Sequence, residues 1–187
     1  MKKPLPFLIT LVLVSLTLGC LMGCSTPVRA PRGSYYKMDG SMLELAQYKR
    51  VNIDAVVNQV QEPVDAVILE EIKNVSKSAF MNSGLFYEVN GLTGPFFNEI
   101  GPESKELEVI PSLVSLDADK GDSRVLMHYA FIDKSTGREL VWVQIIGHGG
   151  EVGVNGAIQG VGIGLSKMFA EEIVKKRNPL RHTQGGH

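Results

Sequence analysis

Two neighbouring segments of alternating hydrophobicity constrain the fold of this 187-residue chain more than any other feature. They are SRVLMHYAFID (123–133) and ELVWVQIIG (139–147), and the turn-forming tetrapeptide KSTG separates them. Alternation with a period of two is typical of β-strands, and a short polar turn joins such strands into an antiparallel hairpin. In the first segment both strand faces are apolar, with Val125, Met127, Tyr129 and Phe131 on one and Leu126, His128, Ala130 and Ile132 on the other. We therefore expect the hairpin to lie in the centre of a sheet.

Shorter patterns predict three elements before this hairpin. YKRVNIDAVV (48–57) alternates and predicts a half-buried strand. Apolar residues then recur at helical spacing from Pro63, which suits a first helical position, to Ser83–Gly84, where glycine favours a helix end. LFYEV (85–89) follows as a second predicted strand.

A strand and a helix complete the predicted fold. The segment 107–116 is strand-like but contains Pro111, which predicts an edge position or a bulge. A closing helix, which ends at Asn178–Pro179, is marked by the apolar positions Leu165, Met168, Phe169 and Ile173. The order β-α-β-β-β-β-α predicts an α+β fold, in which a mixed, mainly antiparallel sheet carries two helices on one face.

The N-terminus carries the features of a bacterial export signal. Lys2 and Lys3 precede an apolar, uncharged run over residues 5–22, which is just long enough for a membrane-spanning helix. The polar turn 25–27 follows in place of a stop-transfer cluster, so a secretion signal is the better interpretation. We expect residues 1–23 to be a signal peptide.

Leu21-Met22-Gly23-Cys24 resembles a bacterial lipobox, whose cysteine thiol takes a diacylglycerol and becomes the mature N-terminus. Cys20 follows Thr17-Leu18-Gly19 and matches less well, so Cys24 is the predicted lipidation site. Two or more acyl chains anchor a protein stably in a bilayer, at about 0.8 kcal/mol per buried CH₂. Ser25 resembles the default sorting signal of such proteins in Gram-negative cells. The expected location is therefore the periplasmic face of the outer membrane.

Cys20 and Cys24 are the two cysteines of the chain, so the body holds no thiol and no disulfide. Packing alone must stabilise this exported domain. We expect residues 24–46 to form the lipidated N-terminus and a flexible tether, because Pro, Gly and Ser are frequent there. Residues 47–178 are the predicted single domain, and 179–187 a polar tail.

Two segments are candidate partner-binding sites. The long loop 91–105 contains Phe96 and Phe97, which are either exposed interaction residues or anchors of the loop itself. The glycine-rich segment 147–164 favours a flexible strand-to-helix loop, because each interior glycine costs a helix about 1 kcal/mol. If this segment is helical, a stripe of small residues spaced four apart permits close approach of a partner; these residues are Gly156, Gly160 and Gly164.

Several function classes receive no support from the sequence. The formal net charge is −1 and the charges are dispersed, which argues against nucleic-acid binding. DADKGDS (117–123) departs from the spacing of a calcium loop, and the four histidines lack the spacing of metal ligands. No Ser-His-Asp or Cys-His pattern indicates catalysis. We therefore expect a protein that is not an enzyme and has no cofactor and no metal.

Two short motifs carry a family resemblance over about residues 48–178. One is a helix that ends in Ser83-Gly84-Leu85-Phe86, and the other is Asp133 followed by Thr136-Gly137 at a hairpin turn. Both resemble a group of bacterial envelope lipoproteins that includes the curli-secretion lipoprotein, the penicillin-binding-protein activator lipoproteins and, more distantly, the N-terminal domain of TolB. The resemblance implies an α/β domain that makes protein contacts without catalysis.

Together these observations predict a lipid-anchored periplasmic module that binds or stabilises another envelope component, such as transport, cell-wall or surface-appendage machinery. The alternative is an envelope lipoprotein that binds a small ligand or a lipid in a pocket between sheet and helices. The expected partners are the membrane, through the lipid, and an envelope protein, with a homo-oligomer as a further form. Nucleic acid is not expected.

Overall fold

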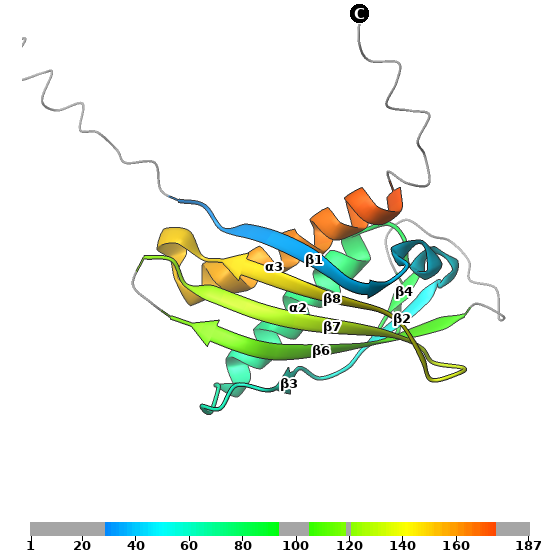
Figure 1. The fold of residues 1–187 in the computed structure, drawn as a ribbon, viewed down its shortest axis with the longest axis horizontal. Helices are drawn as coiled ribbons and strands as arrows, with labels where there is room; N and C mark the ends of the chain where they lie inside the picture. The colour runs from blue at the N-terminus through cyan, green and yellow to red at the C-terminus, as the bar shows by residue number, and fades with distance from the viewer. Residues whose placement is uncertain (1–28, 94–104, 119–120, 175–187) are drawn as a thin grey trace, which may run out of the picture.

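The computed structural model describes residues 29–93, 105–118 and 121–174 of the chain (Figure 1). In these residues eight strands form one sheet in the order β1-β8-β7-β6-β2-β4-β5, while β3 pairs with β6 beside this path. The strands are β1 (Arg32–Gly40), β2 (Arg50–Ile53), β3 (Val57–Asn58), β4 (Glu88–Val89), β5 (Leu92–Thr93), β6 (Glu106–Asp117), β7 (Arg124–Asp133) and β8 (Arg138–His148). The helices are α2 (Ala66–Asn82) and α3 (Val154–Met168), with the 3-10 helices η1 (Met42–Gln47) and η2 (Gly150–Val152) and the π-helix η3 (Phe169–Val174).

The β7–β8 hairpin occupies the centre of the sheet, as its two apolar faces predict. β1 flanks β8 and β6 flanks β7, both in antiparallel register, whereas β2 and β3 pair with β6 in parallel. β2 and β4 are parallel neighbours joined through α2, because parallel strands need a crossover connection. The sheet is therefore mixed and mainly antiparallel, and the predicted α+β fold is confirmed.

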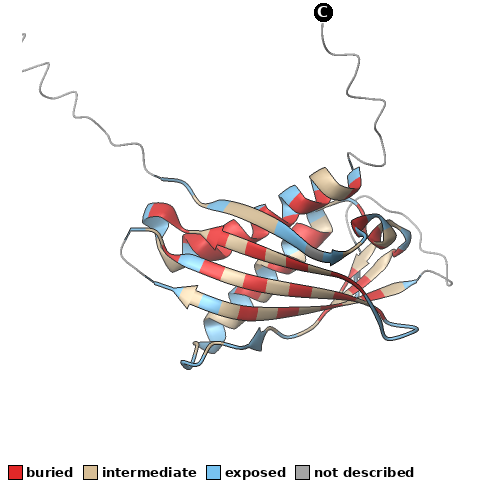
Figure 2. Cartoon of the chain, viewed as in Figure 1, coloured by how far each residue is buried: buried red, intermediate tan, exposed pale blue. Residues whose placement is uncertain are grey.

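Both helices cover one face of this sheet, and the core lies between the two layers (Figures 1 and 2). Every second residue is buried along β7 and along β8 from Val141 onward, which is the alternation read from the sequence. Phenylalanines from four segments meet beneath the sheet, and the rings of Phe80 and Phe169 lie edge to face at 4.8 Å. Such pairs contribute about 0.5–1.5 kcal/mol beyond their buried area. The other rings of this cluster are Phe86 and Phe131.

The first long helix begins slightly later than predicted. α2 starts at Ala66, where the Asp65 side chain caps it by accepting from the Val67 amide at 2.9 Å. An aspartate at this position satisfies a backbone donor that the first helical turn leaves free. At the other end Gly84 adopts a positive φ of 66°, so the predicted stop at Ser83–Gly84 is confirmed.

Pro111 lies inside a strand that is paired on both sides, so the predicted edge position is wrong. The parallel partner of β6 changes there, because β2 pairs as far as Val109 and β3 begins opposite Ser112. Carbonyls of Val109 and Leu113 accept bonds from that side, so the missing N–H of Pro111 falls in the gap between the two partners. The predicted irregularity is present as a register shift between Leu113 and Ser115.

The predicted flexible tether (24–46) is wrong for residues 32–46. Arg32–Gly40 form the edge strand β1 along β8, and η1 follows directly. Tyr35 faces the helices, and its hydroxyl lies 2.9 Å from a carboxylate oxygen of Glu171. Met42 and Leu45 of η1 are buried in the core. The folded domain therefore includes these residues, and a linker to Cys24 is much shorter than expected.

The interpretation of 147–164 as a flexible loop is wrong from Val154 onward, where α3 begins. The glycines let this helix lie directly against β1 and β8. A Cβ on Gly160 would lie 2.8 Å from the Gly147 Cα, and a Cβ on Gly164 would lie 2.8 Å from Ile145 Cγ2. Gly33 of β1 faces the same helix turns. Tertiary contact thus outweighs the poor helix propensity of glycine.

Candidate functional site

An apolar band crosses the face of the sheet that the helices leave uncovered. Register aligns Ile110, Ala130 and Trp142 in one row across β6, β7 and β8, and Leu126 with Ile146 in another. On this face most of the side chains are half-buried by their neighbours in the sheet, and Tyr36 on β1 is 58% exposed. Between these two rows lies a third, in which the polar Ser112 and Gln144 flank His128 and Tyr36 follows on β1. We call this surface the open face; its apolar and aromatic members are Tyr36, Ile110, Leu126, His128, Ala130, Ile132, Trp142 and Ile146. In the sequence, apolar residues occupy both faces of the first hairpin strand. This second apolar face is the sequence feature from which the surface could have been found.

His128 and Trp142 form the aromatic centre of the open face. Their rings meet edge to face at 4.5 Å between centroids. Burial lowers the pKa of His128, because desolvation disfavours the imidazolium form. At neutral pH this histidine is therefore an uncharged, flat contact group beside an indole.

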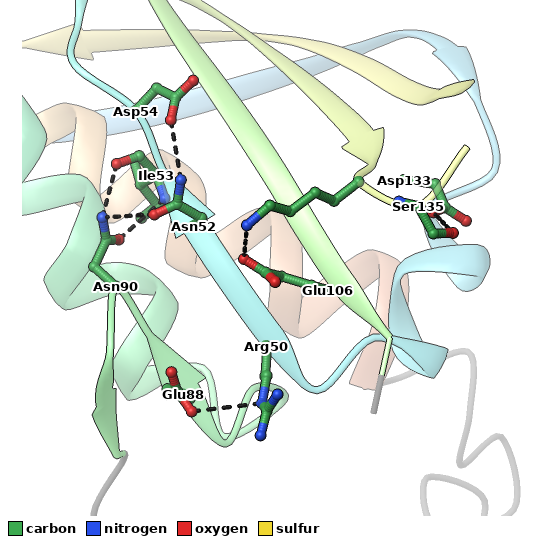
Figure 3. A network of polar contacts seen from close by, with 10 residues as sticks. Arg50, Asn52, Ile53, Asp54, Glu88, Asn90, Glu106, Asp133 and Ser135 are labelled. Atoms are coloured by element: carbon green, nitrogen blue, oxygen red, sulfur yellow. Dashed lines mark hydrogen bonds and ion pairs between the residues drawn. The ribbon is translucent and has the colours of Figure 1, made fainter. Parts of the chain in front are cut away.

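A polar network borders the open face near the start of β2 and β6 (Figure 3). Asn90 has a positive φ of 50°. Its side-chain amide pairs with the backbone of β2 as a neighbouring strand would: Oδ1 accepts from the Ile53 N–H at 3.0 Å, and Nδ2 donates to the Ile53 carbonyl at 2.8 Å. Arg50 pairs with Glu88 across β2 and β4 at 3.5 Å. Lys134 pairs with Glu106 across β7 and β6. Arg50 Nε is buried and has the Glu88 ion pair but no hydrogen bond within the described part of the chain. The network joins β2, β4 and β6 to one another, which is a structural role.

The β7–β8 turn is locked to η1 by a buried polar pair. The Tyr48 hydroxyl donates to the Asp133 carboxylate at 2.8 Å, and the Ser135 hydroxyl and amide donate to the same carboxylate. Hydrogen bonds from Ser135 and then Tyr48 lower the pKa of Asp133 to about 2. Burial and the bond to Asp133 raise the pKa of Tyr48 to about 12. The Asp-x-x-Thr-Gly motif in the sequence thus marks this structural lock.

Charged side chains gather at the opposite end of the sheet. Asp122 lies 3.5 Å from Arg124 Nη2 and 3.6 Å from His148 Nδ1. Desolvation raises the pKa of Asp122, but its electrostatic interactions with His148 and Arg124 outweigh this effect and hold the pKa below its usual value. Asp122 Oδ2 thus faces Arg124 and His148, whereas Asp122 Oδ1 and His148 Nδ1 are buried without a hydrogen-bond partner among the described residues.

A groove of about 980 Å³ runs between α2 and α3 on the helical side of the molecule. Its floor is apolar and formed by Val75, Ala79, Ile158, Gly162 and Ile163. Hydroxyl, amide and charged groups form its rim, namely Glu71, Asn74, Ser78, Asn82, Asn155, Gln159, Ser166 and Lys167. Concave sites of this size with an apolar floor and a few polar groups are typical of ligand pockets.

Of the residues in the predicted site, the structure describes three glycines of α3. Gly156, Gly160 and Gly164 are buried inside the domain, so their assignment to partner binding is wrong. Their small size serves the contact of α3 with the sheet. Phe96, Phe97 and Cys24 lie outside the described residues, and the hypotheses about them stay predictions.

Two general features of the described residues (29–93, 105–118 and 121–174) bear on function. No helix among them combines the length and the apolar character needed to cross a membrane. Nor do these residues bring three histidine, cysteine, aspartate or glutamate side chains together in a group able to hold a metal ion.

No known family profile matches the chain, and no curated protein matches it. Among solved structures it is similar to the PelC dodecamer from Paraburkholderia phytofirmans, with a TM-score of 0.49 and 12% identity over 72% of this chain and 95% of that chain. A single-residue variant of the same dodecamer gives a TM-score of 0.47 and 14% identity over 72% of this chain and 97% of that chain. These values describe a distant likeness, from which we draw no conclusion about this protein.

Proposed function

We propose that this protein is a lipid-anchored component of the bacterial envelope whose domain binds another envelope protein without catalysing a reaction. The lipobox-like Leu21-Met22-Gly23-Cys24 supports the anchor. The thiol-free body supports an exported domain that is held together by packing.

The open face is the observation that carries the proposed binding role. Large apolar side chains on a sheet are normally covered, and a contiguous apolar patch on a soluble domain is typical of an interaction surface. Trp142 and Tyr36 belong to the residue types that dominate binding energy at protein interfaces. A flat sheet face suits another protein, because small molecules bind in concave sites.

Photo-crosslinking in cells tests this role. A photoreactive phenylalanine analogue replaces Tyr36, which is 58% exposed on the open face, or Val67, which is 66% exposed on α2. We expect a discrete crosslinked product from position 36 that is absent from position 67, and its mass distinguishes another protein from a second copy of this chain. The product should be lost when Trp142 is changed to Glu in the same cells. Identical patterns from both positions, or none from position 36, would count against the open face.

The groove between α2 and α3 favours a second candidate function, the binding of a small apolar ligand or a lipid. Its test is native mass spectrometry of the purified protein, where a bound molecule adds a defined mass. Ile163→Glu, at a groove residue 44% exposed, should remove that mass, whereas Val152→Glu, at a residue 50% exposed outside the groove, should leave it. A protein free of added mass would argue against this function.

A further inference from the structure

The chain joins the folded domain at the end of the sheet opposite the β7–β8 turn (Figure 1). The first residue of β1 belongs to a row that crosses four strands at this end, formed by Asp117, Arg124, His148 and Arg32. The preceding residues are fixed there too, because the Arg29 carbonyl accepts from the Glu151 amide at 3.3 Å. We call residues 29–33, 115–118, 121–125 and 147–153 the N-terminal end of the sheet.

Only a short stretch of chain separates this end from the proposed lipid. Cys24 and Arg29 are five residues apart, and a fully extended chain spans at most about 3.6 Å per residue. Arg29 therefore stays within about 18 Å of the acylated cysteine. β7 continues away from this end for ten residues, so the hairpin turn lies about 30 Å further along the strand direction.

The described residues at the N-terminal end of the sheet carry three acidic and three basic side chains, besides His148. An anionic bilayer surface therefore meets no net negative charge there within a Debye length of about 8–10 Å. Charge permits this end to face the headgroups.

We propose that the N-terminal end of the sheet faces the bilayer and that the strands stand away from it, with the β7–β8 turn outermost. The partner surface in this inference is an anionic phospholipid headgroup layer. The proposal rests on the proposed lipidation of Cys24 and adds the orientation of the folded domain relative to the bilayer. In this orientation the open face stands upright beside the membrane, where a neighbouring envelope protein reaches it from the side.

The thiol-free body permits a direct test with single cysteines. Glu151→Cys marks the N-terminal end, and Ser41→Cys marks the position directly after β1, at the far end of the same strand. Both residues are exposed, and the Ser41 side chain makes no capping bond to η1. Each acylated protein is labelled with a fluorophore and reconstituted into vesicles of phosphatidylglycerol and phosphatidylethanolamine that carry a short-range quencher on the headgroup. Flotation of the vesicles and intact mass report lipidation separately.

The quenching pattern decides the orientation once flotation shows that the protein is anchored. We expect the label at position 151 to be quenched severalfold more strongly than the label at position 41. Equal quenching, or stronger quenching at position 41, overturns the proposed orientation while leaving the anchor intact. A protein that fails to float and has an unmodified Cys24 overturns the anchor, and the orientation with it.

A longer tether tests whether the short chain between Cys24 and Arg29 sets the orientation of the domain. Twenty Gly/Ser residues inserted after Pro27 add a root-mean-square reach of about 25 Å. The difference in quenching between positions 151 and 41 should then shrink. If the difference keeps its full size, the short tether does not set the orientation and the inference fails.

Discussion

Gly160→Ala tests the contact that places α3 against the sheet. A Cβ at this position would lie 2.8 Å from both the Gly147 Cα and the His148 N, and closer still to the Arg32 carbonyl oxygen. All three are backbone atoms of β1 and β8, so no side-chain rotation relieves the clash. The helix or the strands must move by more than half an ångström to restore ordinary contact. A methyl group added to a tightly packed site costs about 1–3 kcal/mol, and backbone neighbours favour the upper value.

Gly162→Ala is the matched control, because it lies in the same helix and gains the same helix propensity of about 1 kcal/mol. Its added Cβ would meet Val75 Cγ1 at 2.6 Å, which is a side-chain atom. A rotamer adjustment of Val75 costs about 1 kcal/mol and offsets the propensity gain. We therefore expect Gly162→Ala to be near neutral and Gly160→Ala to lose about 2 kcal/mol in the free energy of unfolding.

Urea denaturation of the mature chain with Cys24→Ser, which removes the lipid site, measures both variants under one condition. A loss of about 2 kcal/mol corresponds to a fall in melting temperature of roughly 4–8 °C for a chain of this size. Circular dichroism should show the same helix content in both folded variants. The reasoning is refuted if Gly160→Ala is as stable as the parent, or if Gly162→Ala is the more damaging change.

Three further predictions concern two buried tyrosine hydroxyl groups and the Asp133 carboxylate. Tyr48→Phe removes the donor to the Asp133 carboxylate at 2.8 Å and should cost about 1–2 kcal/mol of unfolding free energy in urea. Tyr129→Phe should cost about 1 kcal/mol or less in the same assay, because the Ser76 hydroxyl keeps its bond to a helix carbonyl; an equal or larger loss would contradict this. The lowered pKa of Asp133, about 2 against 3.8, stabilises the fold above pH 4, and this stabilisation should vanish as the pH falls from 4 to 2. Asp133→Asn should flatten this part of the stability-against-pH curve, and an unchanged curve would assign the acid sensitivity to other groups.

The central hairpin and the helix α2 were predictable because their signals are local. Alternation over 123–133 and 139–147 sets the faces of both strands, and the intervening turn fixes their pairing. Apolar spacing in α2 likewise predicts which of its residues, such as Ile72 and Ala79, are buried. The strands and helices that this periodicity predicts also gave the correct layer arrangement, in which both helices pack on one face of the sheet.

The errors arose where distant contacts decide the structure. β1 has only a brief alternating stretch around Tyr35, and its pairing partner lies more than a hundred residues further along the chain. α3 contains glycines that argue against a helix in isolation, and only the fit against Gly33 and Gly147 shows why they are present. Pro111 predicted an edge position or a bulge, and the sequence does not reveal that two short parallel strands pair in succession with the same side of β6.

The candidate site likewise combines features that local sequence signals predict with features that depend on distant contacts. Leu126, Ala130 and Ile132 were recognised as an apolar face, but the sequence does not say which of the two faces of the sheet the helices cover. The groove between α2 and α3 depends on the spacing of two helices that are joined by several intervening strands. Of its floor residues, Val75 reads as an ordinary core position from the sequence, whereas Ile158 lies in the segment that the sequence predicts to be a loop.

The mass of the protein isolated from its native membranes tests the proposed lipid anchor most directly. The account predicts a chain that begins at Cys24, 23 residues shorter than the full sequence, with a diacylglycerol thioether and a further acyl chain on that cysteine. Fragmentation should place all added mass on the first residue. A chain that retains the first 23 residues, or a soluble protein with a free Cys24 thiol, would contradict the account.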